Sequence, residues 1–311
     1  MSQSKTNASS PTRIVLAGGA IGFNWLPVFV AGRQGIFERH GLEVERKRMG
    51  AVDKATAAVK SGEADLAITP PEGAIADRLR EGDLRIIAGN VNRLPLTLIA
   101  QPRFSHIEEL KGQRLGTSSL TEGTALYTIE VLSQHGLRYP DDYSFAVVGV
   151  HPARWKALQE GTIEAAVQLI PLNFVAIDAG YANLGEVTDY IPEIIFTALI
   201  GRREWLLQHP GAVSALLRSL VEATEWLYDP AHHAELIPLV MDVTQTDEKY
   251  ASLSLAYMRE KNVFARSLEI PQAALETTLE LMSKAKLLEK ASEATARSVL
   301  DDSFRRQALA Q

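Results

Sequence analysis

The chain has 311 residues, of which 46% are hydrophobic and 23% charged, with a formal net charge of −6 and no cysteine. This length favours two compact units, and the charge argues against general binding to nucleic acid or anionic lipid. The missing cysteines exclude disulfides, thiolate nucleophiles and cysteine-bound metal. No apolar run approaches the roughly 20 residues of a membrane span, so we expect no membrane insertion.

The start of the chain is polar. Residues 1–12 are rich in Ser and Thr and lack the basic start and apolar centre of a signal peptide. Two locations stay open. The protein is periplasmic or otherwise extracytoplasmic if a signal peptide has been removed, and it is cytoplasmic otherwise.

Strands and helices alternate along the first hundred residues. The predicted strands are Ile14–Ala17, Val44–Met49, Leu66–Thr69, Leu84–Ala88 and Leu96–Ala100. Helices are predicted between them at Leu26–Gln34, Val52–Lys60 and Gly73–Arg80. The charged residues of the second strand indicate an edge position. This order predicts a mainly parallel sheet with helices on its faces.

The pattern then restarts. Strands are predicted at Arg114–Gly116, Phe145–Val148, Ala165–Leu169 and Ile194–Ile200, and helices at His106–Leu110, Glu122–Gln134 and Ala153–Gln159. Two long helices follow, opening at Pro210 and Pro271, and they have no sheet of their own. We therefore expect an α/β protein in which residues 103–200 form the second lobe. Residues 1–102 and 201–311 would form a discontinuous first lobe.

Five segments occur in the order found in one known family. They are Leu26–Val44, with its Gly35-Ile36-Phe37 and Gly41-Leu42-Glu43-Val44, and then Lys60–Ala67, Glu109–Gly116, Ala157–Ala166 and His209–Leu227. Together they resemble the substrate-binding proteins of nitrate/sulfonate/taurine ABC importers and the related thiamine-pyrimidine proteins. Each segment is a weak motif alone, but five in register cover most of the chain.

The resemblance implies a type II periplasmic-binding-protein fold, with two lobes, a ligand cleft between them and closure about a hinge. It also implies an ABC permease as partner, no cofactor, and a small polar or anionic organic ligand such as a sulfonate or carboxylate. The chain departs from the thiamine-pyrimidine branch, which has Asp-Trp where this sequence has Gly18-Gly19. The cysteines of the yeast enzymes and of the desulfinases are also missing.

Ligands of α/β sheets bind outside the carboxyl ends of the strands. The loops at those ends supply the candidate binding residues. From the first lobe these are Asn24, Trp25, Gly50, Thr69, Glu72 and Asn90, and from the second Thr117, Ser118, Ser119, Thr121, Gly123, His151, Arg154 and Pro171.

The segment Thr117–Thr124 is the most informative of these loops. Six of its eight residues are Thr, Ser or Gly, and a helix follows, as in sites for carboxylate, sulfonate or phosphate groups. The alternative is plain helix capping by Thr121, and Glu122 argues against a highly charged anion. Trp25 would cover the organic part of the ligand, or would instead seal its helix against the sheet.

A second hypothesis is a cytosolic decarboxylase or lyase acting on an aromatic acid. His151 and Arg154 share a helix face, from which they could bind an anion, and in the enzyme they would supply acid–base groups together with Glu72. The alternative is a surface Arg154 and a capping His151. No Gly-x-Ser-x-Gly, phosphate-loop or His-Glu-x-x-His motif is present. His232 and His233 would point about 100° apart on a helix, so we expect no metal site.

Overall fold

The computed structural model describes residues 10–310, so most of the polar segment 1–12 lies outside the described residues. The first five-stranded sheet has the order β2-β1-β3-β10-β4. Its strands are β1 (Thr12–Gly18), β2 (Leu42–Arg48), β3 (Leu66–Thr69), β4 (Leu84–Val91) and β10 (Thr197–Arg202). β1 pairs in parallel with β2 and β3, whereas β10 runs antiparallel to β3 and β4.

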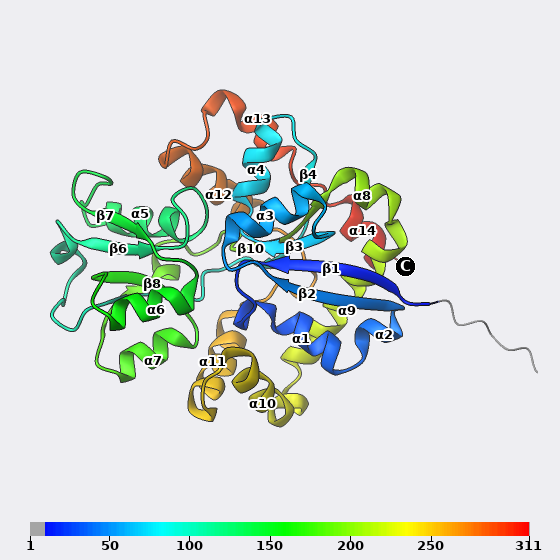
Figure 1. Ribbon diagram of the computed structural model, residues 1–311, viewed down its shortest axis with the longest axis horizontal. Coiled ribbons are helices and arrows are strands. Elements are labelled where there is room, and N and C mark those ends of the chain that lie inside the picture. The colour runs from blue at the N-terminus through cyan, green and yellow to red at the C-terminus, as the bar shows by residue number, and fades with distance from the viewer. Residues whose placement is uncertain (1–9, 311) are drawn as a thin grey trace, which may run out of the picture.

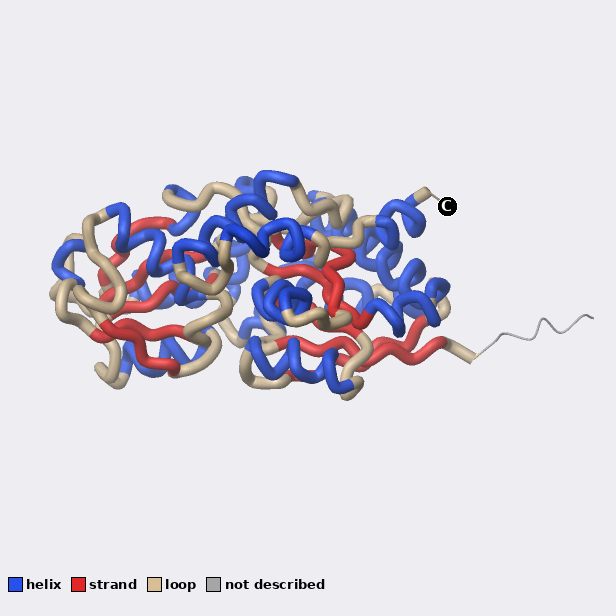
Figure 2. The backbone as a smooth tube through the Cα atoms, turned by 90° about the horizontal axis from the view of Figure 1, so that it is seen from above, coloured by secondary structure: helices blue, strands red, loops and turns tan. Residues whose placement is uncertain are grey.

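The second sheet has the order β7-β6-β8-β5-β9. Its strands are β5 (Leu96–Ala100), β6 (Arg114–Thr117), β7 (Ser144–Val147), β8 (Ala165–Leu169) and β9 (Ala182–Glu186). β6 is parallel to β7 and β8, and β5 is antiparallel to its two neighbours. The two sheets lie apart along the long axis of the molecule (Figures 1 and 2).

Helices flank both sheets. Those of the first half are η1 (Phe23–Trp25), α1 (Leu26–Arg33), α2 (Ile36–Arg39), α3 (Val52–Ser61) and α4 (Glu72–Leu79). Those of the second sheet are η2 (Ile107–Leu110), α5 (Thr124–Gln134), α6 (His151–Gln159), α7 (Leu172–Asp178) and η3 (Val187–Asp189). The predicted α/β architecture of two mainly parallel sheets is confirmed, with one antiparallel strand in each.

The C-terminal third is helical. Its elements are α8 (Arg203–Gln208), α9 (Pro210–Tyr228), η4 (Pro230–His232), α10 (His233–Thr244), α11 (Glu248–Lys261), α12 (Gln272–Lys284), η5 (Lys290–Ser292), α13 (Glu293–Arg297) and α14 (Ser303–Leu309). α9 packs on α1 and α14, and α13 packs on α4. These helices therefore cover the first sheet, as expected from the amphipathic patterns. Within the described residues, no helix is long and apolar enough to cross a membrane.

Two C-terminal helices also touch the second lobe, which the sequence did not indicate. Tyr250 and Lys249 of α11 bind the carboxylate of Asp178 at the end of α7, the tyrosine hydroxyl at 3.0 Å. On the opposite side, Lys284 of α12 lies 3.0 Å from Glu130 of α5. The second lobe is thus held by contacts from both flanks in addition to the chain crossings.

Two expected strand placements are corrected by the sheet order. Leu96–Ala100 was assigned to the first lobe, but β5 lies between β8 and β9 of the second sheet. Residues up to 200 were assigned to the second lobe, but β10 lies between β3 and β4 of the first. The reason is that both strands are mainly apolar and almost entirely buried, so their composition carries no signal of which sheet they join.

The edge position expected for the second strand is confirmed. β2 pairs only with β1, and it alternates apolar Leu42 and Val44 with the exposed Glu43 and Glu45. An edge strand needs one buried face only, and charges on its other face disfavour pairing with another chain. The charge pattern that marked this strand in the sequence therefore has a physical cause in its place in the sheet.

Candidate functional site

A cavity lies between the lobes, at the carboxyl ends of β1, β3, β6 and β8. The residues that line it are Gly19, Ala20, Asn24, Val52, Ile68, Thr69, Pro70, Ser118, Gly123, Thr124, Val150, His151, Arg154, Leu169, Phe196 and Thr197. Its volume of about 60 Å³ has room for a few waters, at roughly 10–15 Å³ each. Six of the fourteen candidate residues meet here: Asn24, Thr69, Ser118, Gly123, His151 and Arg154.

Arg154 is the most unusual group in the cavity wall. Its side chain is only 3% exposed, and its guanidinium donates to the carbonyls of Val167 (3.0 Å) and Gly149 (3.2 Å). No carboxylate among the described residues forms an ion pair with it. Burial lowers the pKa of Arg154 to about 9, which leaves it charged at pH 7. A buried cation without a counter-ion is costly, and an anion in the cavity would compensate it.

His151 lies one helical turn before Arg154 and is largely enclosed. Burial, followed by the charges of Arg154 and Arg48, lowers the pKa of His151 to about 3. The imidazole is therefore neutral at pH 7 and can both donate and accept a hydrogen bond. It faces the first lobe, because a Cβ added to Gly22 would lie 3.3 Å from its Nε2 atom.

The loop before α5 forms a hydroxyl network at the cavity. Thr117 Oγ1 donates to the carbonyl of Ser119 at 2.9 Å and lies 2.9 Å from Thr124 Oγ1. Ser118 lies beside the same hydroxyl, with its N–H and its Oγ each 3.2 Å from Thr124 Oγ1. These contacts hold the loop in place, and Ser118 is one of the residues that line the cavity.

The helix that follows opens at Gly123, not at Thr121. Gly123 is the N-cap of α5, has φ of 67°, and provides no side-chain cap. Plain capping by Thr121 is therefore wrong, because that residue is exposed and precedes the helix. The first N–H groups of a helix have no partner within it. Those of α5 begin at the cavity and favour an anion there.

The first lobe contributes amides and hydroxyls. Asn90 Nδ2 donates to the carbonyl of Asn24 (2.8 Å) and to Thr197 Oγ1 (3.0 Å), and all three residues are buried. Asn90 therefore supports two lining residues and does not line the cavity itself. The amide oxygen of Asn24 is buried without a hydrogen-bond partner, and Thr69 Oγ1 contacts the carbonyl of Val52 at 3.4 Å.

Trp25 does not line the cavity. Its side chain is fully buried, and a Cβ added to Gly18 would lie 2.3 Å from Trp25 Cζ2. The ring packs in the core against the end of β1, so the sealing role is the one it has. From the sequence alone, a tryptophan next to a strand end could lie either in the ligand cleft or in the core. The close approach to Gly18 places it in the core.

Five other candidates also lie outside the cavity lining. Gly50 is exposed at the end of β2, and Ser119 and Thr121 lie on the solvent side of their loop. Pro171 is buried at the start of α7. Glu72 is also buried but lines a separate hollow of about 320 Å³ with Asp53 and Glu122. Glu72, His151 and Arg154 are therefore not gathered at one site.

Sequence reasoning missed most of the apolar wall. Val52, Ile68, Val150, Leu169 and Phe196 line the cavity, but apolar residues at strand ends look the same whether they face a ligand or the core. Thr197 was missed because it begins the returning strand β10. Its position between β3 and β4 was not apparent from the sequence.

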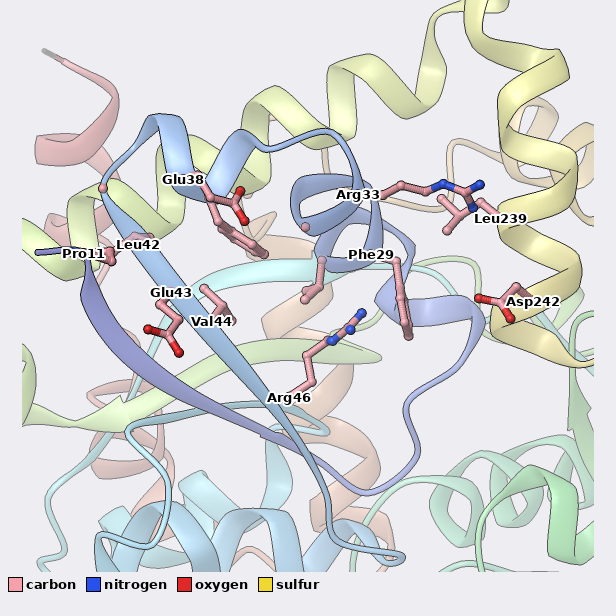
Figure 3. A pocket seen from close by; sticks show the side chains of 14 residues that line it. Pro11, Phe29, Arg33, Glu38, Leu42, Glu43, Val44, Arg46, Leu239 and Asp242 are labelled. Carbon is pink, nitrogen blue, oxygen red and sulfur yellow. The ribbon is translucent and has the colours of Figure 1, made fainter.

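A larger hollow, about 730 Å³, lies on the outer side of the first lobe beside β2, α1 and α10. Figure 3 shows Arg46 directed at Phe29, whose ring centroid lies 4.5 Å from the guanidinium carbon. Arg33, Glu38 and Asp242 are at its rim. This hollow contains none of the candidate residues and does not touch the second lobe.

Comparisons with known proteins agree on a family and a fold. The family model described as "NMT1/THI5 like" matches residues 22–233. A candidate binding protein of Brucella abortus (strain 2308) is 26% identical over 201 residues, which is 63% of this chain and 61% of the relative. A 4-amino-5-hydroxymethyl-2-methylpyrimidine phosphate synthase of Uromyces fabae is 26% identical over 223 residues, covering 66% of this chain and 64% of the relative. The chain therefore matches less than two thirds of each relative's length.

Two solved structures show the fold. The periplasmic nitrate-binding protein NrtA of Synechocystis PCC 6803 has a TM-score of 0.81 at 15% identity, covering 98% of this chain and 90% of that one. The alkanesulfonate-binding protein SsuA of Xanthomonas axonopodis pv. citri, bound to MOPS, has a TM-score of 0.74 at 16% identity, covering 94% and 99%. The expected periplasmic-binding-protein fold is confirmed.

Proposed function

Because the chain belongs to the NMT1/THI5-like family, we propose that it binds a small anionic organic molecule between its lobes and delivers it to an ABC permease. The observation that carries this proposal is Arg154, a buried cation that lines the interlobe cavity and has no acidic partner among the described residues. Its two donors to carbonyl oxygens hold the guanidinium in place, and its remaining N–H groups are available to a ligand.

The other groups at the cavity suit the same ligand. The N-terminus of α5 and Ser118 Oγ provide donors, and neutral His151 adds one more. Val52, Ile68 and Phe196 provide an apolar side for a short organic part. The small volume favours a ligand with few non-hydrogen atoms, and the single uncompensated charge favours one negative charge. Short-chain sulfonates and carboxylates fit both conditions.

In this proposal, the chain divides into two lobes at the points where it crosses from one sheet to the other. The second lobe lies between the crossing at residues 92–95 and the one at residues 187–196, and the rest of the chain forms the first lobe. In the structure, Arg154 of the second lobe and Asn24 and Thr197 of the first line one cavity, which corresponds to the lobes closed about these crossings. The ligand would then stabilise the closed form.

The proposal is tested by a thermal-shift screen of purified protein against nitrate, short alkanesulfonates, short carboxylates and pyrimidines. We expect at least one monovalent anion to raise the melting temperature in proportion to the logarithm of its concentration. Calorimetry with that anion should show at least tenfold weaker binding to Arg154→Gln. Equal affinity of the folded variant, or stabilisation by neutral pyrimidines alone, would contradict the proposal.

We place this receptor outside the cytoplasm, where an ABC importer collects its substrate. Fractionation of the native cells with an antibody against the chain tests the location. Recovery of the protein with cytoplasmic markers would instead favour the second hypothesis, a cytosolic enzyme. That hypothesis draws its support from the relative that is a pyrimidine phosphate synthase, and mass spectrometry of the screened compounds after incubation would detect conversion.

A further inference from the structure

The loop of the second lobe that precedes α5 also makes a contact on the side away from the cavity. Glu122 of this loop packs against α3 and α4 of the first lobe. A Cβ added to Gly73 would lie 2.9 Å from Glu122 Oε1 and 2.8 Å from Thr56 Oγ1. The lobes are therefore in close contact here, and the side chain of Glu122 is 8% exposed.

A second carboxyl, that of Glu72 on α4, lies in the same contact. Glu72 is 1% exposed. Both of its carboxyl oxygens, Glu122 Oε2 and the hydroxyl of Tyr127 lack a hydrogen-bond partner among the described residues. Two acidic groups from opposite lobes are thus enclosed near one potential side-chain donor, and no cation among residues 10–310 forms an ion pair with either.

Burial dominates the ionisation of both groups. It raises the pKa of Glu72 to about 8, and the charge of Glu122 adds to the rise. The backbone N–H groups of Glu72 and Gly123 oppose the rise as nearby dipoles, without forming a hydrogen bond to the carboxyl. Burial also raises the pKa of Glu122 to about 7, with Asp53 adding to the rise. Burial raises the pKa of the Tyr127 hydroxyl as well, and the charge of Glu72 adds to it.

The other charged groups around this hollow do not cancel the effect. On α3, Lys60 is paired with Asp77 of α4 at 2.6 Å, so its charge is already taken. Arg80, beyond α4, also lines the hollow, but it forms no ion pair with Glu72 or Glu122 and does not offset the rise in their pKa values. α12 contributes apolar Met282, and its Lys284 pairs with Glu130. The helix dipoles at the N-termini of α3 and α4 favour the ionised carboxyls. Burial has the larger effect on the pKa of both glutamates.

We propose that closing the lobes takes up a proton at the Glu72–Glu122 contact, so that rising pH weakens the closed form. A proton is the cation that suits this pair, because the described residues include no group of three metal-ligating side chains. The open form exposes both carboxyls to water, while the closed form excludes it. The proposal rests on the lobe movement of the proposed function but not on the identity of any ligand.

The direction follows from linkage. In the open form we expect ordinary carboxyl pKa values near 4.5, whereas in the closed form the pKa of Glu72 is about 8. Between these values the closed form holds more protons, so it loses population as the pH rises. For one proton, the closed-to-open ratio should fall by up to about tenfold per pH unit.

Paired spin labels test this without a ligand. Because the chain has no cysteine, Glu43→Cys on β2 and Lys156→Cys on α6 would label exposed positions on separate lobes without background. Pulsed electron paramagnetic resonance should show a short-distance population at pH 5.5 that declines towards pH 8.5. A distribution that does not change with pH, or no short-distance population at pH 5.5, would overturn the proposal.

Isosteric variants locate the proton. Glu122→Gln and Glu72→Gln in the labelled protein should keep the short-distance population at pH 8.5, because the amides stay neutral. Glu130→Gln, which removes a carboxylate from a neighbouring lobe contact, should retain the pH dependence. Unaltered pH dependence in both of the first two variants would refute the assignment to this pair.

A direct titration covers the case in which a variant does not fold. The side-chain carboxyl carbons of ¹³C-glutamate in wild-type protein should include two resonances that titrate between about pH 6 and 9. If the lobes are closed and every glutamate still titrates near its usual pKa, the proposal fails. This result would leave anion binding at Arg154 unaffected, so the two proposals can fail separately.

Discussion

The indole ring of Trp25 lies against the backbone of Gly18, so closely that a Cβ there would be 2.3 Å from Cζ2. Because Trp25 is fully buried, the ring cannot move aside without disturbing the core beneath the cavity. This contact ties the end of β1 to the start of α1, and both lead directly to residues that line the cavity.

We therefore expect Gly18→Ala to lower the free energy of unfolding by about 1–3 kcal/mol through overpacking. Gly32→Ala is the matched control: it lies in α1, and an added Cβ meets nothing within 4 Å. That variant should be neutral or more stable by up to about 1 kcal/mol. Urea denaturation measures both. An unchanged midpoint for Gly18→Ala would mean that the ring adjusts.

Ser118→Ala should weaken binding of the anion found by screening. Ser118 lines the cavity, and a hydrogen bond from its hydroxyl to a charged group would contribute about 1.5–3 kcal/mol, or roughly tenfold or more in affinity. Ser119→Ala is the control, because Ser119 belongs to the same loop but does not line the cavity. Calorimetry on both variants decides the point. Equal losses would indicate a loop distortion and not a lost ligand contact.

His151 should make the protein less stable in mild acid. Its pKa is lowered to about 3 in the folded chain, against about 6.5 when unfolded. Below pH 6.5 the unfolded chain binds a proton at His151 that the folded chain does not. The stability that the neutral histidine contributes is therefore fully present above pH 6.5 and is lost as the pH falls towards 3.

The slope belonging to this group should reach about 1.4 kcal/mol per pH unit. Urea unfolding at pH 5.0, 5.75 and 6.5 should show a steeper decline for wild type than for His151→Asn, which has no ionisable group. Parallel stability curves for the two proteins would show that His151 stays accessible to protons. Both proteins should also lose stability as the pH rises towards 8, because the folded-state pKa of Glu72 is raised to about 8. This loss should be the same in the variant and in wild type.

Tyr257→Phe tests the contact of α11 with the second lobe. Its hydroxyl donates to the Glu186 carboxylate of β9 at 2.8 Å. We expect a loss of about 1–3 kcal/mol in stability, because the acceptor is charged and partly buried. Lys249→Ala removes an exposed ion pair on the same helix and should cost less than about 1 kcal/mol. If the two losses are equal, the hydrogen bond from Tyr257 to Glu186 contributes no more to stability than the exposed ion pair of Lys249.

Much of the fold could be predicted from local patterns. Segments such as Leu66–Thr69 and Ala165–Leu169 are short apolar runs between glycine or proline turns, and both are strands. The small β9, with only partly buried residues, and the helices α10 and α11 were missed. β9 lacks a continuous apolar run, and Pro238 interrupts the pattern of α10. Their places depend on tertiary contacts that leave no regular period.

The candidate site could be predicted in part, for a related reason. Ser118, Gly123, His151 and Arg154 were identified because polar residues after parallel strands must meet at one edge of the sheet. Glu72 satisfied the same rule, yet it lines the separate hollow that it shares with Glu122. The sequence locates a loop at the right edge but does not specify which way each side chain turns.

The position of β10 between β3 and β4 affects the order in which the protein can be built on the ribosome. The first sheet has a gap until residues 197–202 emerge, whereas all strands of the second sheet lie within residues 96–186. The second sheet should thus be completed first, although its strands are translated later than most of the first sheet, and the lobe that begins the chain should wait for its returning strand β10. Proteolysis of ribosome-bound nascent chains that end before β10 should find β6 and β8 protected but β3 and β4 accessible. Equal accessibility of all four strands would instead mean that both lobes form in one cooperative step.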